Sequence, residues 1–418
     1  MQQKQAVTKK LAIKYKQARK KEKGEILDRL IELTGYNRSY QARLLRQKAK
    51  PKVVGRFKSG DINIILVEDG RVKRKKKSKR PRKYGTKVFE PLKKIWFICD
   101  CICGKRLAPY LPEIIPVLER WGEIELEEEV REKLLQISAA TIDRLLAPVR
   151  KRYQIKGRSG TKPGTLLKGQ IPIRTYSEWN ENRPGFVEVD LVSHEGGDPS
   201  GDFAHTLDLT DIHTGWTETK AVKNKAQVWV FEALEEIIER LPFKLLGLDS
   251  DNGSEFINAH LLRFCKQEKI TFTRARPYRK NDSCFVEQKN WSVVRKAVGY
   301  RRYDTEEELR ILNRLYDTVR LYTNFFQPVM KLVEKRRIGS KVKKKYDQPR
   351  TPFRRVLESS FIDKEAKKEL RDEYEKLNPA ALKRKITRLQ EELERVNCAK
   401  RDANKNKQNT KDLEYVFK

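Results

Sequence analysis

The chain is poor in long apolar runs and in cysteine, and each shortage excludes a class of protein. No run of about 18 apolar residues occurs in its 418 residues, so the sequence predicts no transmembrane span. The lysine-rich first twenty residues lack the apolar core and the small-residue cleavage site of a secretory signal. Six cysteines are too few for a disulfide scaffold, so a reducing, cytoplasmic compartment is expected.

Acidic residues are scarce relative to basic ones. Lys and Arg number 93 and Asp and Glu 58, which gives a formal net charge of +35. So positive a field attracts polyanions, with nucleic acid the leading partner and an anionic membrane surface the second. A ribosome-associated or merely basic protein is the alternative that charge alone leaves open.

Residues 1–50 have the layout of a helix-turn-helix unit. Leu27, Leu30 and Ile31 follow helical spacing, and Gly35 marks the end of that helix. A short basic helix follows, and its arginines are the expected DNA contacts: Arg38, Arg43 and Arg46. An ordinary pair of helices with a solvated basic face is the alternative.

The rest of the chain divides by composition. Ten of the thirteen residues at positions 71–83 are Lys or Arg, which is typical of a solvated linker. We predict a basic linker at 51–87, a second helical, helix-turn-helix-like unit at 88–153, a Gly- and Pro-rich linker at 154–184, and a basic, helical C-terminal region at 301–418.

Residues 185–300 form the predicted α/β core. GFVEVDLVS, FAHTLDLTDI and WTETKAVKN read as three successive strands with short turns between them. A helix, the strand KLLGLDS, a helix, the strand ITFTRARP and a last helix follow. This order implies a mixed sheet of five strands with flanking helices.

Three acids in this core are the candidate catalytic residues. Asp190 lies in the first strand, Asp251 lies just beyond the buried strand LLGL, and Glu287 lies on the last helix. Carboxylates that converge repel one another, and divalent cations such as Mg²⁺ supply the missing positive charge. These three acids are therefore interpreted as a metal-binding site within a basic, phosphate-binding surface. Neighbouring acids are rivals for these roles: Asp208, Asp211, Asp249 and Glu255.

These residues resemble a known family. The spacing of the acids, with thirty-five residues between Asp251 and Glu287, and the segments VEVD, SDNGSEF and FVEQKN are similar to the catalytic core of the DDE integrases and transposases. The helix-turn-helix and the segments NFFQP and KKKYDQP resemble the bacterial transposases of insertion sequences. The resemblance implies a ribonuclease-H-like fold, with Asp190, Asp251 and Glu287 as ligands of two Mg²⁺ or Mn²⁺ ions.

The same resemblance implies a reaction and its partners. Such an enzyme cleaves DNA at the terminal inverted repeats of its element and joins the exposed 3′-hydroxyls to target DNA. A homo-oligomer on DNA, in the bacterial cytoplasm at the nucleoid and without membrane, is then expected. Lys289, Asn290 and Arg295 are further candidate DNA contacts, whereas Trp291 is expected in the core.

Two departures and two alternatives accompany this resemblance. Cys284 stands where many integrases have Gly, three residues before the catalytic Glu, and no histidine precedes His194, so a retroviral zinc module is absent. A transposase-derived DNA-binding regulator without catalysis is one alternative function. A nuclease of the same fold that acts on RNA–DNA hybrids is the other, and the basic N-terminal and C-terminal regions fit it poorly.

Overall fold

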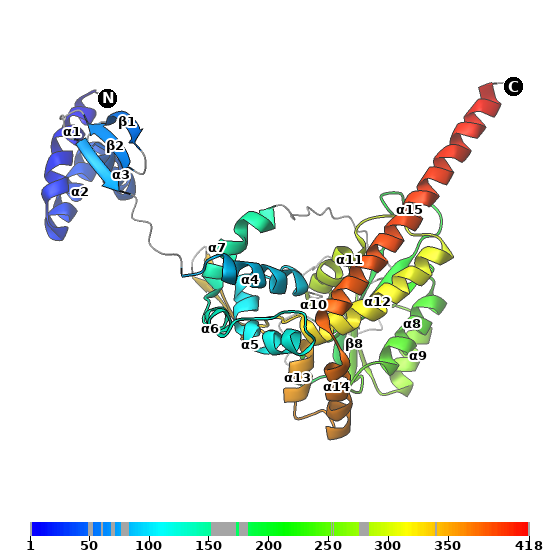
Figure 1. Ribbon diagram of the computed structural model, residues 1–418. Helices are drawn as coiled ribbons and strands as arrows, with labels where there is room; N and C mark the ends of the chain where they lie inside the picture. Colours follow the sequence, from blue (N-terminus) through cyan, green and yellow to red (C-terminus); the bar gives the residue numbers. More distant parts are fainter. Residues whose placement is uncertain are drawn as a thin grey trace. The chain divides into compact units, whose positions relative to one another are not determined.

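The computed structural model describes residues 2–48, 53–59, 62–67, 72–76, 83–151, 173–174, 183–251, 253, 255–275, 284–338 and 341–416. The chain divides into two compact units, Met1–Lys83 and Tyr84–Lys418 (Figure 1). None of the helices in the described ranges is both long enough and apolar enough to cross a lipid bilayer.

The N-terminal unit contains three helices: α1 (Gln2–Gln17), α2 (Lys20–Thr34) and α3 (Arg38–Lys48). Their contacts enclose a small core that includes Leu27, Leu30 and Leu45. As predicted, α2 ends at Gly35, whose φ of 68° is left-handed and whose N–H donates to the carbonyl of Ile31 at 2.7 Å.

The prediction of a linker over residues 51–87 is wrong for its middle part. A three-stranded antiparallel sheet is formed there by β1 (Val53–Ser59), β2 (Ile62–Val67) and β3 (Val72–Lys76). The basic residues 72–76 form β3, which lies at the edge of this sheet. Lysines are tolerated in an edge strand because one side of it has no neighbouring strand.

The second unit is built on a sheet with the order β4-β9-β8-β5-β6-β7. β5 (Phe186–Ser193), β6 (His205–Asp211) and β7 (Thr217–Val222) pair antiparallel, whereas β8 (Gly247–Ser250) and β9 (Thr271–Ala275) run parallel to β5. The two-residue strand β4 (Ile173–Arg174) lies on the outer edge, inside the region expected to be a linker. The five longer strands have the mixed, ribonuclease-H-like arrangement that was predicted.

The two faces of this sheet differ in chemistry because side chains alternate along each strand. Val187, Val189, Leu207, Leu209 and Leu248 pack on one face with helices α8 (Gln227–Glu239) and α9 (Ala259–Gln267). The opposite face of β5 and β6 contacts α10 (Cys284–Lys289) and the π-helical segment η3 (Asn290–Arg295), which continues into α11 (Lys296–Val298). The acidic side chains of the strands therefore lie beneath the helix that carries Glu287.

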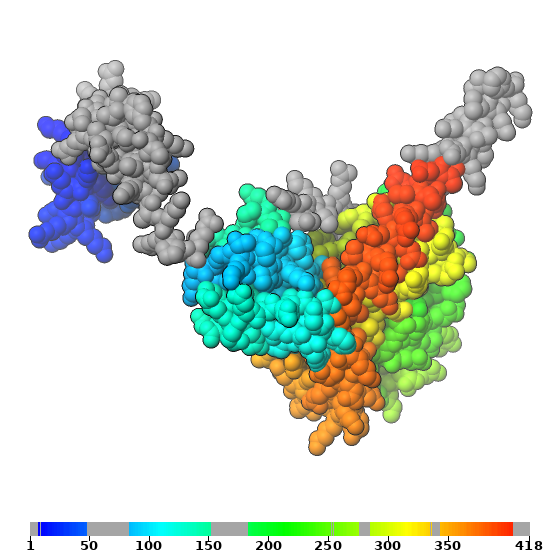
Figure 2. Space-filling view, in the orientation of Figure 1, coloured from blue at the N-terminus to red at the C-terminus, as the bar shows by residue number. Residues whose placement is uncertain are grey.

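Residues 88–153 are not a separate unit, contrary to prediction. Their helices are α4 (Thr86–Ile98), α5 (Gly104–Arg120), α6 (Glu128–Leu135) and α7 (Ala139–Arg150). Trp96 and Ile114 share one hydrophobic cluster with Trp216 and Tyr316 of the sheet unit. Figure 2 shows these helices, in cyan, against the orange C-terminal helices. Long-range apolar contacts join them to the core, and no local pattern in the sequence reveals such contacts.

The C-terminal region is mostly helical, as predicted, but it also contains a hairpin. Helix α12 (Glu306–Phe326) precedes strands β10 (Leu332–Ile338) and β11 (Lys341–Tyr346). Helices α13 (Pro352–Glu358), α14 (Lys364–Lys376) and α15 (Pro379–Val416) follow. The two strands form a separate antiparallel sheet of their own.

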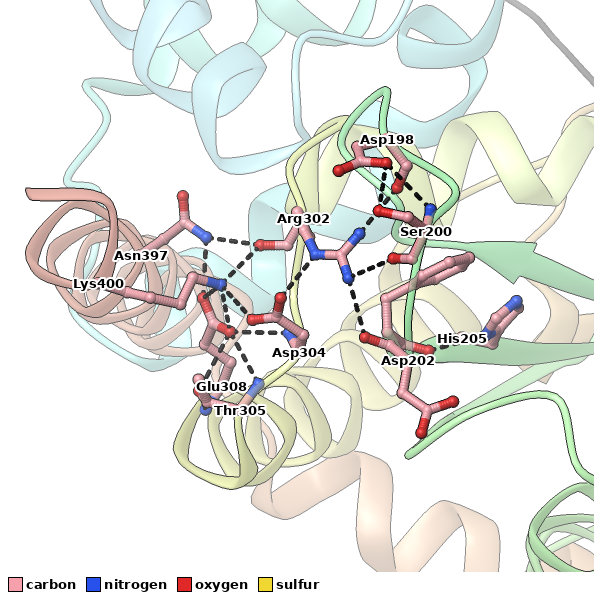
Figure 3. A network of polar contacts seen from close by, with 11 residues as sticks. Asp198, Ser200, Asp202, His205, Arg302, Asp304, Thr305, Glu308, Asn397 and Lys400 are labelled. Carbon is pink, nitrogen blue, oxygen red and sulfur yellow. Dashed lines mark hydrogen bonds and ion pairs between the residues drawn. The ribbon is translucent and has the colours of Figure 1, made fainter. Parts of the chain in front are cut away.

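A polar network fixes the loop between β5 and β6 to α12 and α15 (Figure 3). The Arg302 guanidinium donates to Asp304 and to three loop carbonyls, those of Asp198, Ser200 and Asp202, at 2.6 to 3.1 Å. Lys400 and Asn397 of α15 donate to the buried carboxylate of Glu308 at 2.7 and 2.8 Å. The loop that follows the strand of Asp190 is thus held by the C-terminal helices.

Candidate active site

A row of acids occupies one face of the sheet. Asp190 pairs in register with Asp208 on β6, and Glu188, two residues earlier, pairs with Asp249 on β8. Asp251 lies two residues beyond Asp249, just after the end of β8. Because side chains two apart on a strand share a face, these carboxylates collect on the side covered by α10 and η3.

Asp190 and Asp251 are brought close enough to influence each other. Burial and the charges of Asp190 and Glu255 together raise the pKa of the Asp251 carboxyl to about 7, against the hydrogen bond from the Gly253 N–H at 2.8 Å, which lowers it. Burial also raises the pKa of Asp190. The charged groups that raise the pKa of Asp251 are acids. The repulsion between these carboxylates would be relieved either by protonation of one of them or by a bound cation.

Glu287 lies in the first turn of α10, and its side chain is exposed. Its charge helps to raise the pKa of Glu188. Among the residues that the structure describes, no three His, Cys, Asp or Glu side chains form a cluster that could hold a metal ion. The structure therefore places Asp190 and Asp251 together and Glu287 on the covering helix, but it does not close them into one ligand set.

Glu188 is a site residue that the sequence analysis missed. It is fully buried, and its Oε2 accepts hydrogen bonds from the N–H groups of Phe285 and Val286 at 2.8 and 2.9 Å. The first N–H groups of a helix have no acceptor within the helix itself, so a strand carboxyl caps the helix of Glu287. Burial, then Asp249 and Glu287, raise the pKa of Glu188 well above its ordinary value. The alternation in VEVD, which places Glu188 beside Asp190, was the available signal.

Asn290 and Lys289 turn inward, although both were expected to contact DNA. The Asn290 amide donates to Oδ2 of Asp190 at 2.6 Å, so it orients that carboxylate. The Lys289 side chain is buried, and its Nζ donates to the carbonyl of Gly215 at 3.1 Å. Burial lowers the pKa of Lys289 to about 8, and the negative charge of Asp208 opposes that shift. The structure thus does not favour a phosphate contact for Lys289.

Arg295 also has intramolecular partners. It donates to the carbonyl of Ser193 at 2.7 Å, and its guanidinium lies 4.8 Å from the centre of the Tyr300 ring. Trp291, which was expected in the core, is 54% exposed. Trp291 lies four residues after the exposed Glu287, so the two side chains share one face of the helix.

The arginines of α3 lie in the N-terminal unit, and all three are exposed. Arg38 forms an ion pair with Asp28, and Arg43 lies over the ring of Tyr40 at 5.4 Å from its centre. DNA contacts by these residues and by Arg46 remain a prediction.

The chemistry of the donor set fits a divalent cation. Asp190 and Asp251 present carboxylate oxygens at the carboxyl-terminal side of two adjacent parallel strands, where ligands of α/β sheets commonly lie. Oxygen ligands from Asp and Glu suit Mg²⁺, and the mutual repulsion of the two carboxylates is the electrostatic condition that such an ion relieves.

Comparison with known proteins gives three results. No family model matches the chain. Among solved structures, the HTLV-2 integrase catalytic core domain in complex with magnesium is 15% identical, with a TM-score of 0.27 over 35% of this chain and 90% of that one. The catalytic core domain of BIV integrase is 17% identical, with a TM-score of 0.28 over 42% and 94%. At these scores the strand order, and not the likeness, identifies the fold.

A relative in sequence is more similar. An uncharacterized protein of Sinorhizobium fredii (strain NBRC 101917 / NGR234), y4rM, is 39% identical over 343 residues. The match covers 82% of this chain and 91% of the relative. The chain therefore belongs to the same protein family as y4rM.

Proposed function

We propose that the protein is a DDE-type DNA transposase, an integrase-like enzyme that binds the ends of a mobile element and catalyses DNA cleavage and strand transfer. The observation that carries the proposal is the pair Asp190 and Asp251 on adjacent parallel strands, beneath a helix that bears Glu287. The strand order and the charge of +35 support it, because the first suits such a core and the second suits DNA.

The three acids have defined roles in this proposal. Asp190, Asp251 and Glu287 would hold Mg²⁺ or Mn²⁺, and two such ions, when bound, activate an attacking oxygen and stabilise the leaving one. Asn290 orients Asp190 through its hydrogen bond of 2.6 Å, and Glu188 holds the first turn of α10 in place. We expect Glu287 to complete the ligand set when DNA and metal are present.

The substrates would be the terminal inverted repeats of the element and a target duplex, with α3 reading the repeats. Two element ends must be processed together, so a homo-oligomer on DNA is expected. An insertion sequence carried on the nucleoid of a bacterial cell is the corresponding setting.

A strand-transfer assay tests the proposal. The purified chain would receive labelled DNA with its element's end, a target plasmid and Mg²⁺ or Mn²⁺, beside Asp251→Asn and Glu287→Gln. Joined product from the native chain alone, with end binding retained in both variants, supports the transposase and its metal ligands. Equal product from the native chain and the variants would reject these residues as catalytic.

A silent DNA-binding regulator is the second candidate, and one observation favours it. The described residues do not close Asp190, Asp251 and Glu287 into a metal cluster. The regulator would be selected by tight binding to the element end without cleavage in Mg²⁺ or Mn²⁺. Calorimetry should then give the same heat on addition of Mg²⁺ to the native chain and to Asp251→Asn.

A further inference from the structure

The hairpin of β10 and β11 is an unusual part of the second unit. Residues 332–346 contain seven Lys or Arg and one acid, Glu334. Two of its cross-strand pairs join cations, Lys335 with Lys344 and Arg336 with Lys343. Like charges directly opposite each other destabilise a sheet, so the isolated ribbon is unfavourable without a counter-charge.

The described apolar side chains of the ribbon, those of Leu332, Val333 and Tyr346, belong to no buried cluster. β10 and β11 belong to no larger sheet, and a two-stranded hairpin is marginally stable in water. Val333 is 63% exposed and Tyr346 is 46% exposed. The basic side chains of Arg336 and of Lys343 to Lys345 are exposed as well. Glu334, the one acid in the sequence of residues 332–346, pairs with Arg336, so the ribbon keeps a large net positive charge.

The base of the ribbon, in contrast, is fixed. The Lys331 N–H donates to Oδ1 of Asp347 at 2.7 Å, and the Asp347 N–H donates back to the Lys331 carbonyl at 3.0 Å. The buried Arg355 forms an ion pair with Asp347 at 2.7 Å and donates to the carbonyl of Val329 at 3.1 Å. A basic ribbon with a rigid base has the construction of an arm that holds a ligand in one orientation.

The same base is connected to the catalytic helix. Nζ of Lys331 donates to the carbonyl of His213, and Nζ of Lys289 donates to the carbonyl of Gly215, both in the turn between β6 and β7. Lys289 lies two residues after Glu287 on α10. One turn of the chain therefore positions both the ribbon and the helix of the active site, so a ligand on the ribbon is oriented relative to Glu287.

We propose that the β10–β11 ribbon is a DNA-binding arm that lies in the major groove of a DNA duplex. The groove is about 12 Å wide and admits a two-stranded β-ribbon. In the register, cations fall on both faces of the ribbon: Arg336 and Lys343 on one, Lys344 on the other. A ribbon lying on a flat surface would use one face, whereas the two phosphate rows that border a groove can be reached from both.

This proposal rests on the proposed function for the choice of DNA, but its test does not require catalysis. A 30-base-pair duplex of arbitrary sequence would be titrated with the full-length chain in EDTA over a range of salt concentrations. The test variant is the triple change Lys343→Gln, Lys344→Gln and Lys345→Gln. The matched control removes three exposed lysines of α14, by Lys364→Gln, Lys368→Gln and Lys376→Gln. Melting curves of both variants verify folding, and Lys344→Gln alone serves if the triple variant melts early.

The plot of log K for DNA binding against log salt has a negative slope. We expect this slope to be less steep by roughly 3 in the ribbon variant, about 0.9 for each phosphate that is no longer neutralised, and by about 1 in the single variant. The control should change the slope by less than about 1. Guanine N7 lies in the major groove, so its protection from dimethyl sulfate should disappear in the ribbon variant and persist in the control. An RNA duplex, with its narrow major groove, should be bound equally by all three proteins.

Equal slope changes in ribbon variant and control would overturn the arm. Unchanged N7 protection in the ribbon variant, or a matching loss of RNA binding, would overturn its place in the groove. Glu287→Gln, assayed in parallel, separates the two proposals. If the native chain binds DNA through the ribbon but shows no strand transfer, the DNA-binding arm is supported and the enzyme is rejected. If it shows strand transfer but its DNA binding does not depend on the ribbon, the enzyme is supported and the arm is rejected.

Discussion

Replacing Glu188 tests whether a buried strand carboxyl positions the helix that carries Glu287. Glu188→Ala removes the acceptor of the Phe285 and Val286 N–H groups, and it leaves the buried N–H of Val286 without this hydrogen bond. An unsatisfied buried donor costs about 1–3 kcal/mol, so we expect α10 to be destabilised by about 1–3 kcal/mol. Glu188→Gln keeps one carbonyl oxygen for both donors, and it mimics the protonated acid that the raised pKa favours. Its cost should stay below about 1 kcal/mol.

Hydrogen exchange measures this difference locally. In Glu188→Ala the amides of residues 285 and 286 should exchange about 5-fold to 150-fold faster than in the native chain, whereas exchange in β6 stays unchanged. Glu188→Gln should be close to native at every site. Strand transfer should fall with the helix in the alanine variant and survive in the glutamine variant. Equal exchange at 285 and 286 in both variants and the native chain would refute the capping role.

Three further predictions concern the acids and the N-terminal unit. The pKa of Asp251 is raised by burial to about 7 in the folded chain, against about 3.9 when unfolded, so its carboxylate opposes folding above pH 7 and this cost disappears as pH falls towards 4. Urea unfolding should therefore show Asp251→Asn more stable than the native chain at pH 8, by at most about 4 kcal/mol, and equal to it near pH 4. Equal stabilities at pH 8 would exclude a buried charge. At pH 8, Mg²⁺ at 100 times its Kd should stabilise the native chain by about 2.7 kcal/mol and leave Asp251→Asn unchanged in the same titration. Removal of residues 1–83, a compact unit of their own, should leave the melting of the remainder unchanged and weaken binding to the element end more than binding to unrelated DNA in a gel-shift assay; equal losses would exclude sequence reading by α3.

Local patterns predicted the central sheet of the second unit well. The strands containing Asp190 and the segment before Asp251 were expected from alternation and from apolar runs bounded by turns, and both are present. The ends of helices also depend on nearby residues. Gly35 terminates α2, and Oγ of Ser138 accepts a hydrogen bond from the N–H of Thr141 at the start of α7. These features depend on residues a few positions apart, so they could be predicted from the sequence.

Features that depend on distant residues were missed or misplaced. Glu188 caps a helix 97 residues away, and Asn290 binds a carboxylate 100 residues away, so neither role is visible along the chain. Lys289 was expected at the surface because lysines are seldom buried, yet it lies inside and donates to the Gly215 carbonyl. The basic segments that became β3 and β10 were expected as a linker and as helix, because charge hides the strand pattern.

Residue types and short spacings along the chain were enough to define the order of strands and helices in the core, the three candidate acids and the excess of positive charge. Three-dimensional packing settled which side chains share the acidic face, that Glu188 and Asn290 support the helix and Asp190, and that residues 84–151 pack on the core. It also placed the base of the basic hairpin beside the turn that receives Lys289. Packing brings together groups about a hundred or more residues apart, and their burial then sets which charges are tolerated and which require a partner.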